Sequence, residues 1–290
     1  MHSNRYQSHI RTFRRLYPLN ILLTLDRNYL QPLRVLLTSL FINHPGESFH
    51  IYLAGDGLTQ DDWDTVNMLC SRFSATLHPV TINESWFESA PTLRYYSRAM
   101  YYRLLAAQML PDDLERILYL DPDTLVINSL CPLYGTDMGD HLYAACIHKG
   151  LVDLSTPVNK LRLSTYENEG YFNSGILLMN LPRIRKMVFP QVIFDYVREN
   201  HALLVLPDQD VLNGLYGEHI LALDECLWNY DARKYREYLL ASTGVCDIDW
   251  VMEHTAILHF CGKKKPWKNG YTGRFSALYK HYLQLSKRFE

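Results

Sequence analysis

The chain has 290 residues, of which 48% are hydrophobic and 21% charged, which is ordinary for a soluble globular protein and excludes a largely disordered one. Its formal net charge of -2 gives no electrostatic sign of a nucleic-acid partner. The six cysteines form no CxxC pair, which excludes a zinc ribbon and a dithiol redox motif and fits a reducing cytosol.

Neither an export signal nor a membrane span is predicted. The first 17 residues contain four arginines but no apolar stretch of the kind that a signal peptide needs. The most apolar stretch, residues 19–41, is interrupted by Asp26, Arg27 and Arg34. We therefore expect a cytoplasmic protein that at most contacts a membrane from one side.

The two ends of the chain are basic. No acidic residue precedes Asp26, and after Gly262 six Lys and two Arg face Glu290 as the single acidic residue. Solvated ends are one interpretation, and peripheral contact with an anionic membrane is the other. The second rests also on the aromatic residues of these ends: Tyr6, Phe13, Tyr17, Trp267, Phe275, Tyr279, Tyr282 and Phe289.

The first half of the chain alternates predicted strands with predicted helices. Short apolar runs predict strands at residues 20–25, 49–54, 75–80 and 116–120. Apolar residues at helical spacing predict helices at residues 29–41, 60–72 (with Thr59 as N-cap) and 97–109. This alternation predicts a largely parallel sheet, in which ligands bind outside the carboxyl ends of the strands. Asp26 and Asp121 follow two of these strands and are expected at that edge.

The second half is less regular. Strands are expected at residues 142–146 and 174–180, and a helix at 183–199 with a break or fresh start at Pro190. A last helix is expected between Phe275 and Phe289. The long polar segment 149–170 is expected to be a functional loop that covers an acceptor.

The segment RILYLDPDTLV (116–126) places Asp121 and Asp123 directly after a predicted buried strand. Unpaired carboxylates there are costly, so a metal, a cation or cleft water must offset them. Side chains at i and i+2 point the same way in an extended segment, and two carboxylates together suit Mg²⁺ or Mn²⁺ shared with phosphate oxygens. An aspartate pair that makes only turn and cap hydrogen bonds is the alternative.

The same two aspartates allow a second interpretation, in which the protein is a phosphatase. Haloacid-dehalogenase-type phosphatases carry a nucleophilic Asp in a DxDx[TV] motif after an apolar strand. Here Leu125 occupies the last position, and the motif lies well inside the chain. This alternative stays open on the DxD alone.

The segment HFCGKKKPW (259–267) is the second candidate site. His259 follows the apolar run 256–258, and imidazole is a suitable ligand for Mn²⁺. Gly262 allows close approach of the backbone, and Lys265 can bind a phosphate as a point charge. The alternatives are a hydrogen-bonded histidine and a solvated lysine loop.

Five segments in this order resemble glycosyltransferase family 8, whose members are retaining enzymes of GT-A fold that use nucleotide sugars. HFCGKKKPW is similar to the HxxGxxKPW pattern of that family, and RILYLDPDTLVINSLCPLY to its metal-binding segment. YFNSGILLMNL (171–181), LPDQDVLN (206–213) and TLDRNY (24–29) resemble its FN[AS]G segment, its DQDxLN segment and its nucleoside-holding strand end. The DQD form looks nearer the bacterial lipopolysaccharide galactosyl- and glucosyltransferases than glycogenin.

The resemblance implies the nucleotide and metal ligands. Asp121, Asp123 and His259 would bind Mn²⁺ (or Mg²⁺), which bridges the diphosphate of a UDP-sugar, and Gly262 and Lys265 would contact that diphosphate. The remaining donor-binding residues that the resemblance implies for uracil, ribose and the sugar are Thr24, Asp26, Asn28, Tyr29 as a stacking neighbour, and Arg103.

The resemblance also implies the sugar site and the catalytic residues. Asn173 and Ser174, with Asp208 and Gln209, would line the sugar site. Gln209 would lie beneath the anomeric carbon. Asp210 is the nearest carboxylate in that motif. Because an amide is a poor nucleophile, we expect front-face attack, in which the acceptor hydroxyl enters on the side from which UDP leaves.

We therefore expect an α/β protein of GT-A fold, with a Rossmann-like, mostly parallel central sheet flanked by helices and a smaller acceptor-binding extension. We expect a single domain over residues 1–290, with a nucleotide-sugar half (about 18–130), a sugar and acceptor half (about 131–270) and a basic C-terminal helix (271–290). The predicted activity is metal-dependent retaining transfer of galactose or glucose from a UDP-sugar to a glycan or glycolipid hydroxyl, in cell-surface polysaccharide or lipopolysaccharide synthesis.

Three alternatives to this function stay open. They are a self-glucosylating glycogenin-like primer, the DxD phosphatase, and a glycan- or nucleotide-binding module on an inactive scaffold. One departure concerns sugar choice: His148 stands where the family often has Asp, so neither the sugar nor the acceptor can be carried over from the resemblance.

Overall fold

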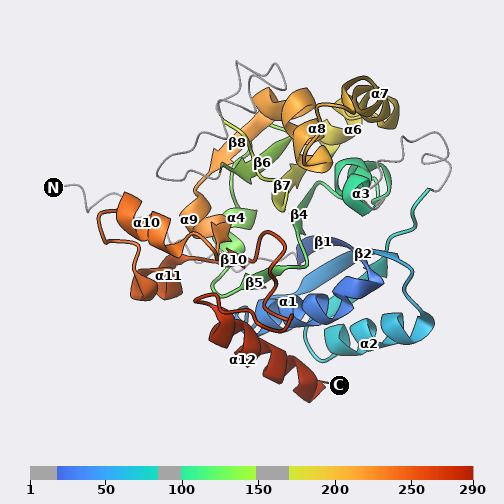
Figure 1. Cartoon of the computed structure of the whole chain (residues 1–290). Coiled ribbons are helices and arrows are strands. Elements are labelled where there is room, and N and C mark those ends of the chain that lie inside the picture. Colours follow the sequence, from blue (N-terminus) through green and yellow to red (C-terminus); the bar gives the residue numbers. More distant parts are fainter. Residues whose placement is uncertain (1–17, 84–98, 148–169, 290) are drawn as a thin grey trace.

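The computed structural model describes residues 18–83, 99–147 and 170–289 (Figure 1). Its larger sheet has seven strands in the order β3-β2-β1-β4-β7-β6-β8. The strands are β1 (Leu19–Asp26), β2 (Phe49–Asp56), β3 (Ala75–Pro79), β4 (Arg116–Leu120), β6 (Tyr143–Cys146), β7 (Ile176–Asn180) and β8 (Ile220–Leu223). Within it β7 runs antiparallel to both its neighbours, β4 and β6, while the other pairings are parallel. The expectation of a mostly parallel α/β sheet is therefore confirmed.

Helices cover both faces of this sheet (Figure 1). One face packs on α1 (Leu30–Ile42) and α2 (Gln60–Ser71), with the short α4 (Cys131–Tyr134) beside them. The other face packs on α3 (Ala99–Leu105), α6 (Leu181–Met187), α7 (Pro190–Asn200) and α8 (Pro207–Tyr216). Alternation along β1 explains the two layers, because Ile21, Leu23 and Leu25 pack on the first face and Leu22 on the second.

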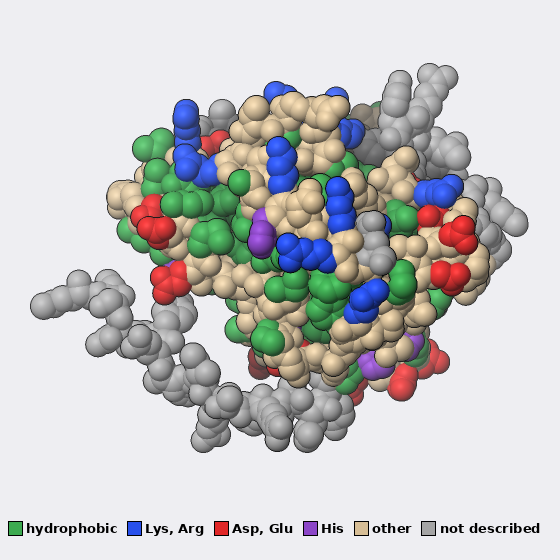
Figure 2. Space-filling model, turned by 90° about the horizontal axis from the view of Figure 1, so that it is seen from below, with side chains coloured by type: hydrophobic (Ala, Val, Ile, Leu, Met, Phe, Trp, Pro, Cys, Tyr) green, Lys and Arg blue, Asp and Glu red, His purple; other side chains and the backbone are tan. Residues whose placement is uncertain are grey.

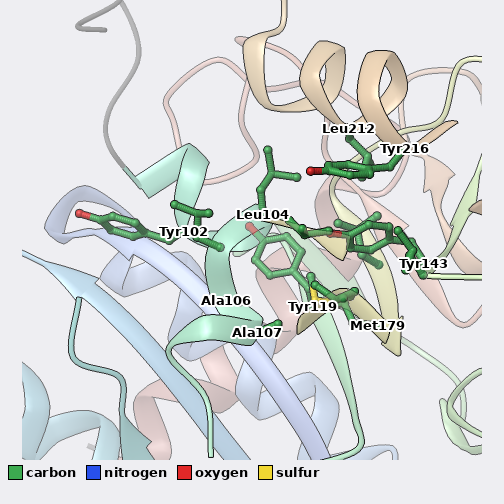
Figure 3. Close-up of a cluster of buried hydrophobic side chains, with 14 of the residues drawn as sticks. Tyr102, Leu104, Ala106, Ala107, Tyr119, Tyr143, Met179, Leu212 and Tyr216 are labelled. Carbon is green, nitrogen blue, oxygen red and sulfur yellow. The ribbon is translucent and has the colours of Figure 1, made fainter. Parts of the chain in front are cut away.

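The buried cluster between the larger sheet and α3, α6, α7 and α8 contains many aromatic side chains (Figure 3). Tyr119 on β4 lies there near Tyr143 and Met179, with no exposed surface of its own. This packing fixes the ring of Tyr119 and so the direction in which its hydroxyl points, toward the carboxyl end of β4.

A second, three-stranded sheet was not expected from the sequence. It has the order β5-β10-β9, formed by β5 (Thr124–Val126), β10 (Ile257–His259) and β9 (Tyr230–Asp231). The helices α9 (Glu225–Trp228), α10 (Tyr235–Ala241), α11 (Ile248–His254) and α12 (Ser276–Ser286) surround it. Its antiparallel pairing sets His259 opposite Thr124, which brings His259 next to Asp123.

Short 3-10 helices complete the elements: η1 (Arg27–Tyr29), η3 (Ala106–Gln108), η4 (Gly217–His219) and η5 (Lys287–Phe289). The expected N-cap of α2 is confirmed, since Thr59 and Asp62 form a reciprocal capping box. The fresh start at Pro190 is also confirmed, because α7 begins there with Pro in its first turn. Within the described part of the helix expected over 97–109, α3 ends at Leu105 and η3 follows it.

Several sequence expectations fall outside the described residues. These are the basic and aromatic N-terminal segment (1–17), His148 and almost all of the acceptor loop 149–170. None of the helices that the structure describes is long and apolar enough to cross a membrane.

The expected surface role of the C-terminal aromatic residues is corrected by the structure. Phe275, Tyr279 and Tyr282 are buried around the second sheet. Trp267 and Phe289 are half-buried. Trp267 packs against Tyr279, and Phe289 packs against Phe73. Amphipathic spacing in the segment 275–289 places the rings of Phe275, Tyr279 and Tyr282 toward the protein core, so these three are not available to a membrane.

Candidate functional site

The polar residues predicted from separate motifs meet at one edge of the larger sheet. Asp26 ends β1, and Asp121 follows β4. Because β7 is antiparallel to β4, the residues before β7 lie at this same edge, and the backbone N–H of Asp121 donates to the carbonyl of Gly175 over 2.7 Å. The reversal of one strand thus places the segment 171–175 beside the DxD segment.

Asp121, Asp123 and His259 form a cluster that could hold a metal ion. One ligand atom from each lies within 4.8 Å of the others. His259 Nε2 is 3.2 Å from Asp123 Oδ1 and 3.8 Å from Asp121 Oδ2. Two carboxylate oxygens and an imidazole nitrogen are a suitable donor set for a divalent cation such as Mn²⁺ or Mg²⁺.

Asn229 fixes the orientation of His259. The backbone N–H of Gly175 donates to Asn173 Oδ1 over 2.9 Å, so that oxygen is an acceptor, and Asn229 Nδ2 donates to it over 2.8 Å. The other side-chain atom of Asn229, Oδ1, therefore accepts from His259 Nδ1 at 2.8 Å. With Nδ1 as the donor, Nε2 is left to face the two carboxylates, as a metal-ligating histidine requires.

Gly175 makes room for this cluster. A Cβ atom at this position would lie 2.4 Å from His259 Cε1 and 2.7 Å from Asp121 Oδ2. Real Cβ atoms do not approach other atoms so closely, and both neighbours are held by other contacts. Only glycine therefore fits between the histidine and the carboxylate.

Lys265 neutralises one of the two carboxylates. Its Nζ donates to Asp123 Oδ2 and, over 2.9 Å, to the carbonyl of Phe260. Burial by itself would raise the pKa of Asp123, but the attraction of His259 and Lys265 outweighs burial and holds this pKa well below its usual range. Asp123 is thus a carboxylate at neutral pH.

Asp121 is less fully compensated. Burial raises its pKa, as does the nearby Asp123, while Arg103 lowers it. Tyr119 donates its hydroxyl to Asp121 Oδ1 over 2.6 Å, and Arg103 Nη2 lies 3.0 Å from the same oxygen. The other oxygen, Oδ2, faces His259. Two neighbouring carboxylates, one of them with a raised pKa, favour the binding of a further cation.

Arg103 joins the DxD segment to α8. Its guanidinium contacts Asp121 on one side and Asp208 Oδ2 on the other, at 3.1 Å. Ser174 Oγ donates to the same Asp208 oxygen over 2.9 Å. Asn173 Nδ2 donates to Gln209 Oε1 over 3.1 Å. The predicted sugar-site residues are therefore connected by direct hydrogen bonds.

A cavity of about 390 Å³ lies among these side chains. It is lined by Arg103, Asp121, Asp123, Asn173, Ser174, Leu206, Asp208, Gln209, Arg233, His259, Cys261 and Gly262. Nine of the residues that the sequence singled out are in this lining, although they come from five separate segments. The lining carries charged side chains of both signs.

Asp210 lies apart from this cavity. Its carboxylate is fully buried and accepts from the backbone N–H groups of Val205 and Leu206 and from the hydroxyl of Tyr171. Successive residues of a helix point about 100° apart, so the first turn of α8 turns Asp208 and Gln209 toward the cavity and Asp210 away from it. Three donors already use this carboxylate.

The predicted nucleoside residues lie at the end of β1. Asp26 caps η1 by accepting from the N–H of Asn28 over 2.8 Å, and Asn28 is exposed. Thr24 is buried, and its hydroxyl is 3.2 Å from that of Tyr119. Tyr29 is half-buried and meets Trp267 edge-on, 5.8 Å between ring centroids. These residues border the cluster without lining the cavity.

Sequence reasoning missed Gly175, Asn229 and Arg233. Gly175 lies within the FN[AS]G segment, directly after the predicted sugar-site residues Asn173 and Ser174. That position is the signal that could have drawn attention to it. Nothing in the local pattern around Asn229 or Arg233 indicated a function. Arg233 is held by Asp231, which is fully buried, and reaches over Gly262 into the cavity.

Comparisons with known proteins agree with this geometry. The family model described as glycosyl transferase family 8 matches residues 20–270. General stress protein A of Bacillus subtilis (strain 168) is 25% identical over 268 residues, covering 90% of this chain and 92% of that protein. Lipopolysaccharide 1,2-glucosyltransferase of Escherichia coli (strain K12) is 26% identical over 256 residues, covering 86% of this chain and 72% of that protein.

A solved structure shares the fold. The galactosyltransferase LgtC, in complex with donor and acceptor sugar analogues, superposes with a TM-score of 0.73 at 24% identity, covering 92% of this chain and 96% of the other. The fold is thus the GT-A fold expected from the sequence. Because the family model spans most of the chain, this protein is a glycosyltransferase that belongs to family 8.

Proposed function

We propose that this protein is a metal-dependent, retaining hexosyltransferase that transfers galactose or glucose from a UDP-sugar to a hydroxyl group of a glycan. The observation that carries the proposal is a single cavity lined both by Asp121, Asp123 and His259 and by Gln209, with Lys265 bonded to Asp123 beside it. A site for a diphosphate and a site for a sugar are thereby adjacent. The relatives named above as a glucosyltransferase and a galactosyltransferase support a hexose as the transferred sugar.

The donor set fits a divalent cation, most naturally Mn²⁺ or Mg²⁺. When bound, the cation would neutralise the charge that develops on the diphosphate as the glycosidic bond breaks. Asp121, Asp123 and His259 would hold it. The raised pKa of Asp121 and the position of His259 Nε2, which faces both carboxylates, are the observations of this structure that support the fit.

The protein's own cations complete the leaving-group site. Lys265 lies beside Asp123 and would bind a phosphate oxygen, and Gly262, which has a positive φ of 79° and no side chain, would lie against the diphosphate. Asp26, Asn28 and Tyr29 would hold the nucleoside at the end of β1. The buried Thr24 would contribute through its backbone rather than its hydroxyl, which is engaged by Tyr119.

The sugar would lie between Arg103, Asp208 and Gln209. Their mutual contacts hold these groups in place before the donor binds, and such preorganised dipoles lower the barrier most where charge develops. The acceptor hydroxyl would attack on the face from which UDP departs, and its proton would pass to the departing phosphate oxygen. Asp210 takes no part in this scheme, because its carboxylate already accepts three hydrogen bonds away from the cavity.

The test is UDP release from a panel of UDP-sugars with and without Mn²⁺. We expect slow release from UDP-galactose or UDP-glucose that requires the metal and leaves other UDP-sugars intact. A mass increase of the protein itself would instead support the self-glucosylating alternative. Absence of both UDP release and UDP–Mn²⁺ binding by calorimetry would overturn the proposal.

A membrane-associated glycan is the acceptor that we propose, with the protein acting at the cytoplasmic face of the membrane. Figure 2 shows a face on which Lys and Arg side chains lie between hydrophobic ones, with acidic groups toward its sides. On the C-terminal segment Lys280, Lys287 and Arg288 are exposed. Because the nearby rings are buried, any such contact would be electrostatic.

Co-sedimentation with vesicles tests this contact. We expect binding to vesicles with anionic lipid, little binding to neutral ones, and release at high salt. Equal binding to both vesicle types, or none at all, would contradict the electrostatic contact without touching the donor-site proposal.

A further inference from the structure

A second hollow, of about 910 Å³, lies beside the donor cavity. It is formed by the start of α10 and by two parts of the segment after β10, residues 263–264 and 271–274. Five cationic side chains line it: Arg233, Arg236, Lys263, Lys264 and Arg274. Glu237 is the one acidic residue in this lining. We call this hollow the basic hollow.

The charge of the basic hollow is only partly compensated. Arg233 is neutralised by the buried Asp231, which accepts from its Nη2 over 2.6 Å. Among the residues that the structure describes, no carboxylate is in ion-pair contact with Arg236, Lys263 or Lys264. Like charges that gather in a hollow destabilise the fold slightly, and they attract an anion to it.

Two of the arginines are held in position. The guanidinium of Arg274 lies over the ring of Tyr235, 4.0 Å from its centroid. Arg233 is fixed by two-point contact with Asp231. Positioned guanidinium groups recognise phosphate with two parallel hydrogen bonds, whereas lysines add point charges. The half-buried ring of Tyr271 offers a surface for a sugar.

Arg233 connects the basic hollow to the donor cavity. It is part of the lining of both. Its Nη1 lies 2.5 Å from the position that a Cβ of Gly262 would take, so the guanidinium occupies the space beside this glycine. In Figure 1, α10 lies on the opposite side of β10 from β1, where the nucleoside would bind. The basic hollow is therefore next to the reacting groups but away from the nucleoside.

We propose that the basic hollow binds a phosphate group of the acceptor, so that the acceptor of this transferase is a phosphorylated glycan. The inference rests on the proposed function, because it assigns the second substrate of the same reaction. The phosphate could be carried at the reducing end of the acceptor, as in a sugar linked to a lipid phosphate, or on a sugar ring. Both sources share a dianionic phosphate ester, which matches the cationic lining of the basic hollow.

The experiment compares three probes: glucose, glucose 6-phosphate and glucose 1-phosphate. Ligand-observed NMR measures their dissociation constants for the full chain saturated with UDP and Mn²⁺, so that the phosphate-binding groups of the donor cavity are already occupied. The test variant is Lys263→Gln/Lys264→Gln. The matched control is Lys268→Gln/Lys280→Gln, which removes the same charge from exposed lysines outside the basic hollow.

We expect the protein to bind at least one hexose phosphate about tenfold more tightly than glucose. The test variant should lose most of that preference, while the control variant keeps it, and raising the salt concentration should weaken it. Preference for glucose 1-phosphate would assign the phosphate to the reducing end of the acceptor. Preference for glucose 6-phosphate would assign it to a sugar ring.

Equal binding of glucose and both phosphates would overturn the proposal, and so would an equal loss in the test and control variants. UDP–Mn²⁺ affinity and UDP release, measured on the same preparations, separate this failure from a failure of the proposed function. If both are present but the phosphate preference is not, only the basic hollow has been misassigned. Thermal unfolding of both variants confirms that they are folded.

Discussion

The metal and sugar side of the donor cavity differs from its nucleoside side in how far the side chains are already held. On the first side, Asp123, His259 and Asn229 are buried, and each is hydrogen-bonded or ion-paired to another side chain. On the second side, Asn28 is exposed, and the contact described for Asp26 is a local cap of η1. One side is a preformed network and the other an open edge.

The difference follows the chemistry that each side would have to perform. Groups that stabilise developing charge act best when they need no rearrangement, and burial strengthens their electrostatic effect. Groups that only hold a nucleoside contribute binding energy that is the same before and during the reaction. Substitutions in the network should therefore affect metal binding and turnover strongly, whereas substitutions at the open edge should affect mainly the affinity for donor.

The largest effect is expected for Asp123→Asn. The amide is a weaker metal ligand and leaves the buried Lys265 without its carboxylate partner. We expect Mn²⁺ affinity to fall by roughly 100-fold or more and UDP release to fall to background. Calorimetry measures the first and a UDP assay the second. Unchanged Mn²⁺ affinity would show that the cluster does not bind the metal.

Gly175→Ala should come next. The added methyl group would overlap His259 and Asp121, so the two must separate. We expect Mn²⁺ affinity to fall by about tenfold or more, with a loss of stability of about 1–3 kcal/mol from overpacking.

Gly55→Ala is the matched control for that prediction. Its added methyl group meets the side chains of Leu58 and Trp63 rather than a residue of the cluster. Chemical denaturation and Mn²⁺ titration of both variants should show a stability change in either case but a metal defect only at Gly175. If Gly175→Ala kept the Mn²⁺ affinity of the natural protein, as Gly55→Ala is expected to do, the packing argument would be contradicted.

Substitutions of Asn229 are expected to have a smaller effect. Two different variants separate the contributions of its hydrogen bonds to His259 and to Asn173. Asn229→Ala removes the acceptor for His259 Nδ1, and we expect Mn²⁺ affinity to fall by about 10- to 100-fold. Asn229→Asp keeps an acceptor but loses the donor to Asn173. It should restore most of the metal affinity while leaving turnover reduced.

Asn43→Ala provides the control for Asn229. Asn43 also bonds to other groups through its amide, to the Ser39 and Val126 carbonyls and the Tyr282 hydroxyl, but away from the cavity. It should lower the melting temperature without changing Mn²⁺ affinity. If Asn229→Ala behaved in the same way, its role would be structural only.

The smallest effect is expected at the open edge. Asn28→Ala removes one exposed amide, and we expect KM for the UDP-sugar to rise by about fivefold with kcat unchanged, since one hydrogen bond contributes about 1 kcal/mol. Mn²⁺ affinity should stay as in the natural protein. A matching fall in kcat would mean that the edge takes part in the reaction and that the two sides do not differ as described.

The sequence by itself determined the local elements and the groups of residues that carry the chemistry. The short apolar run at 20–25 and the helical spacing within 29–41 are visible in short windows, and both elements form where predicted. The DxD segment could be placed at a strand end for the same reason. The fold and most of the cavity lining followed from the ordered motifs that resemble family 8.

Only the tertiary structure decided which of these residues meet and which way they point. The reversal of β7 and the pairing of β10 with β5 bring Gly175 and His259 to Asp121 and Asp123, across sequence separations that no local period records. The same holds for Asn229 and for Arg233 over Gly262. The direction of side chains around α8 places Gln209 at the cavity. The next residue, Asp210, points away from it, and its buried carboxylate accepts hydrogen bonds instead. Spacing along a chain fixes periodicity, whereas a site depends on strand order and side-chain direction, which only packing determines.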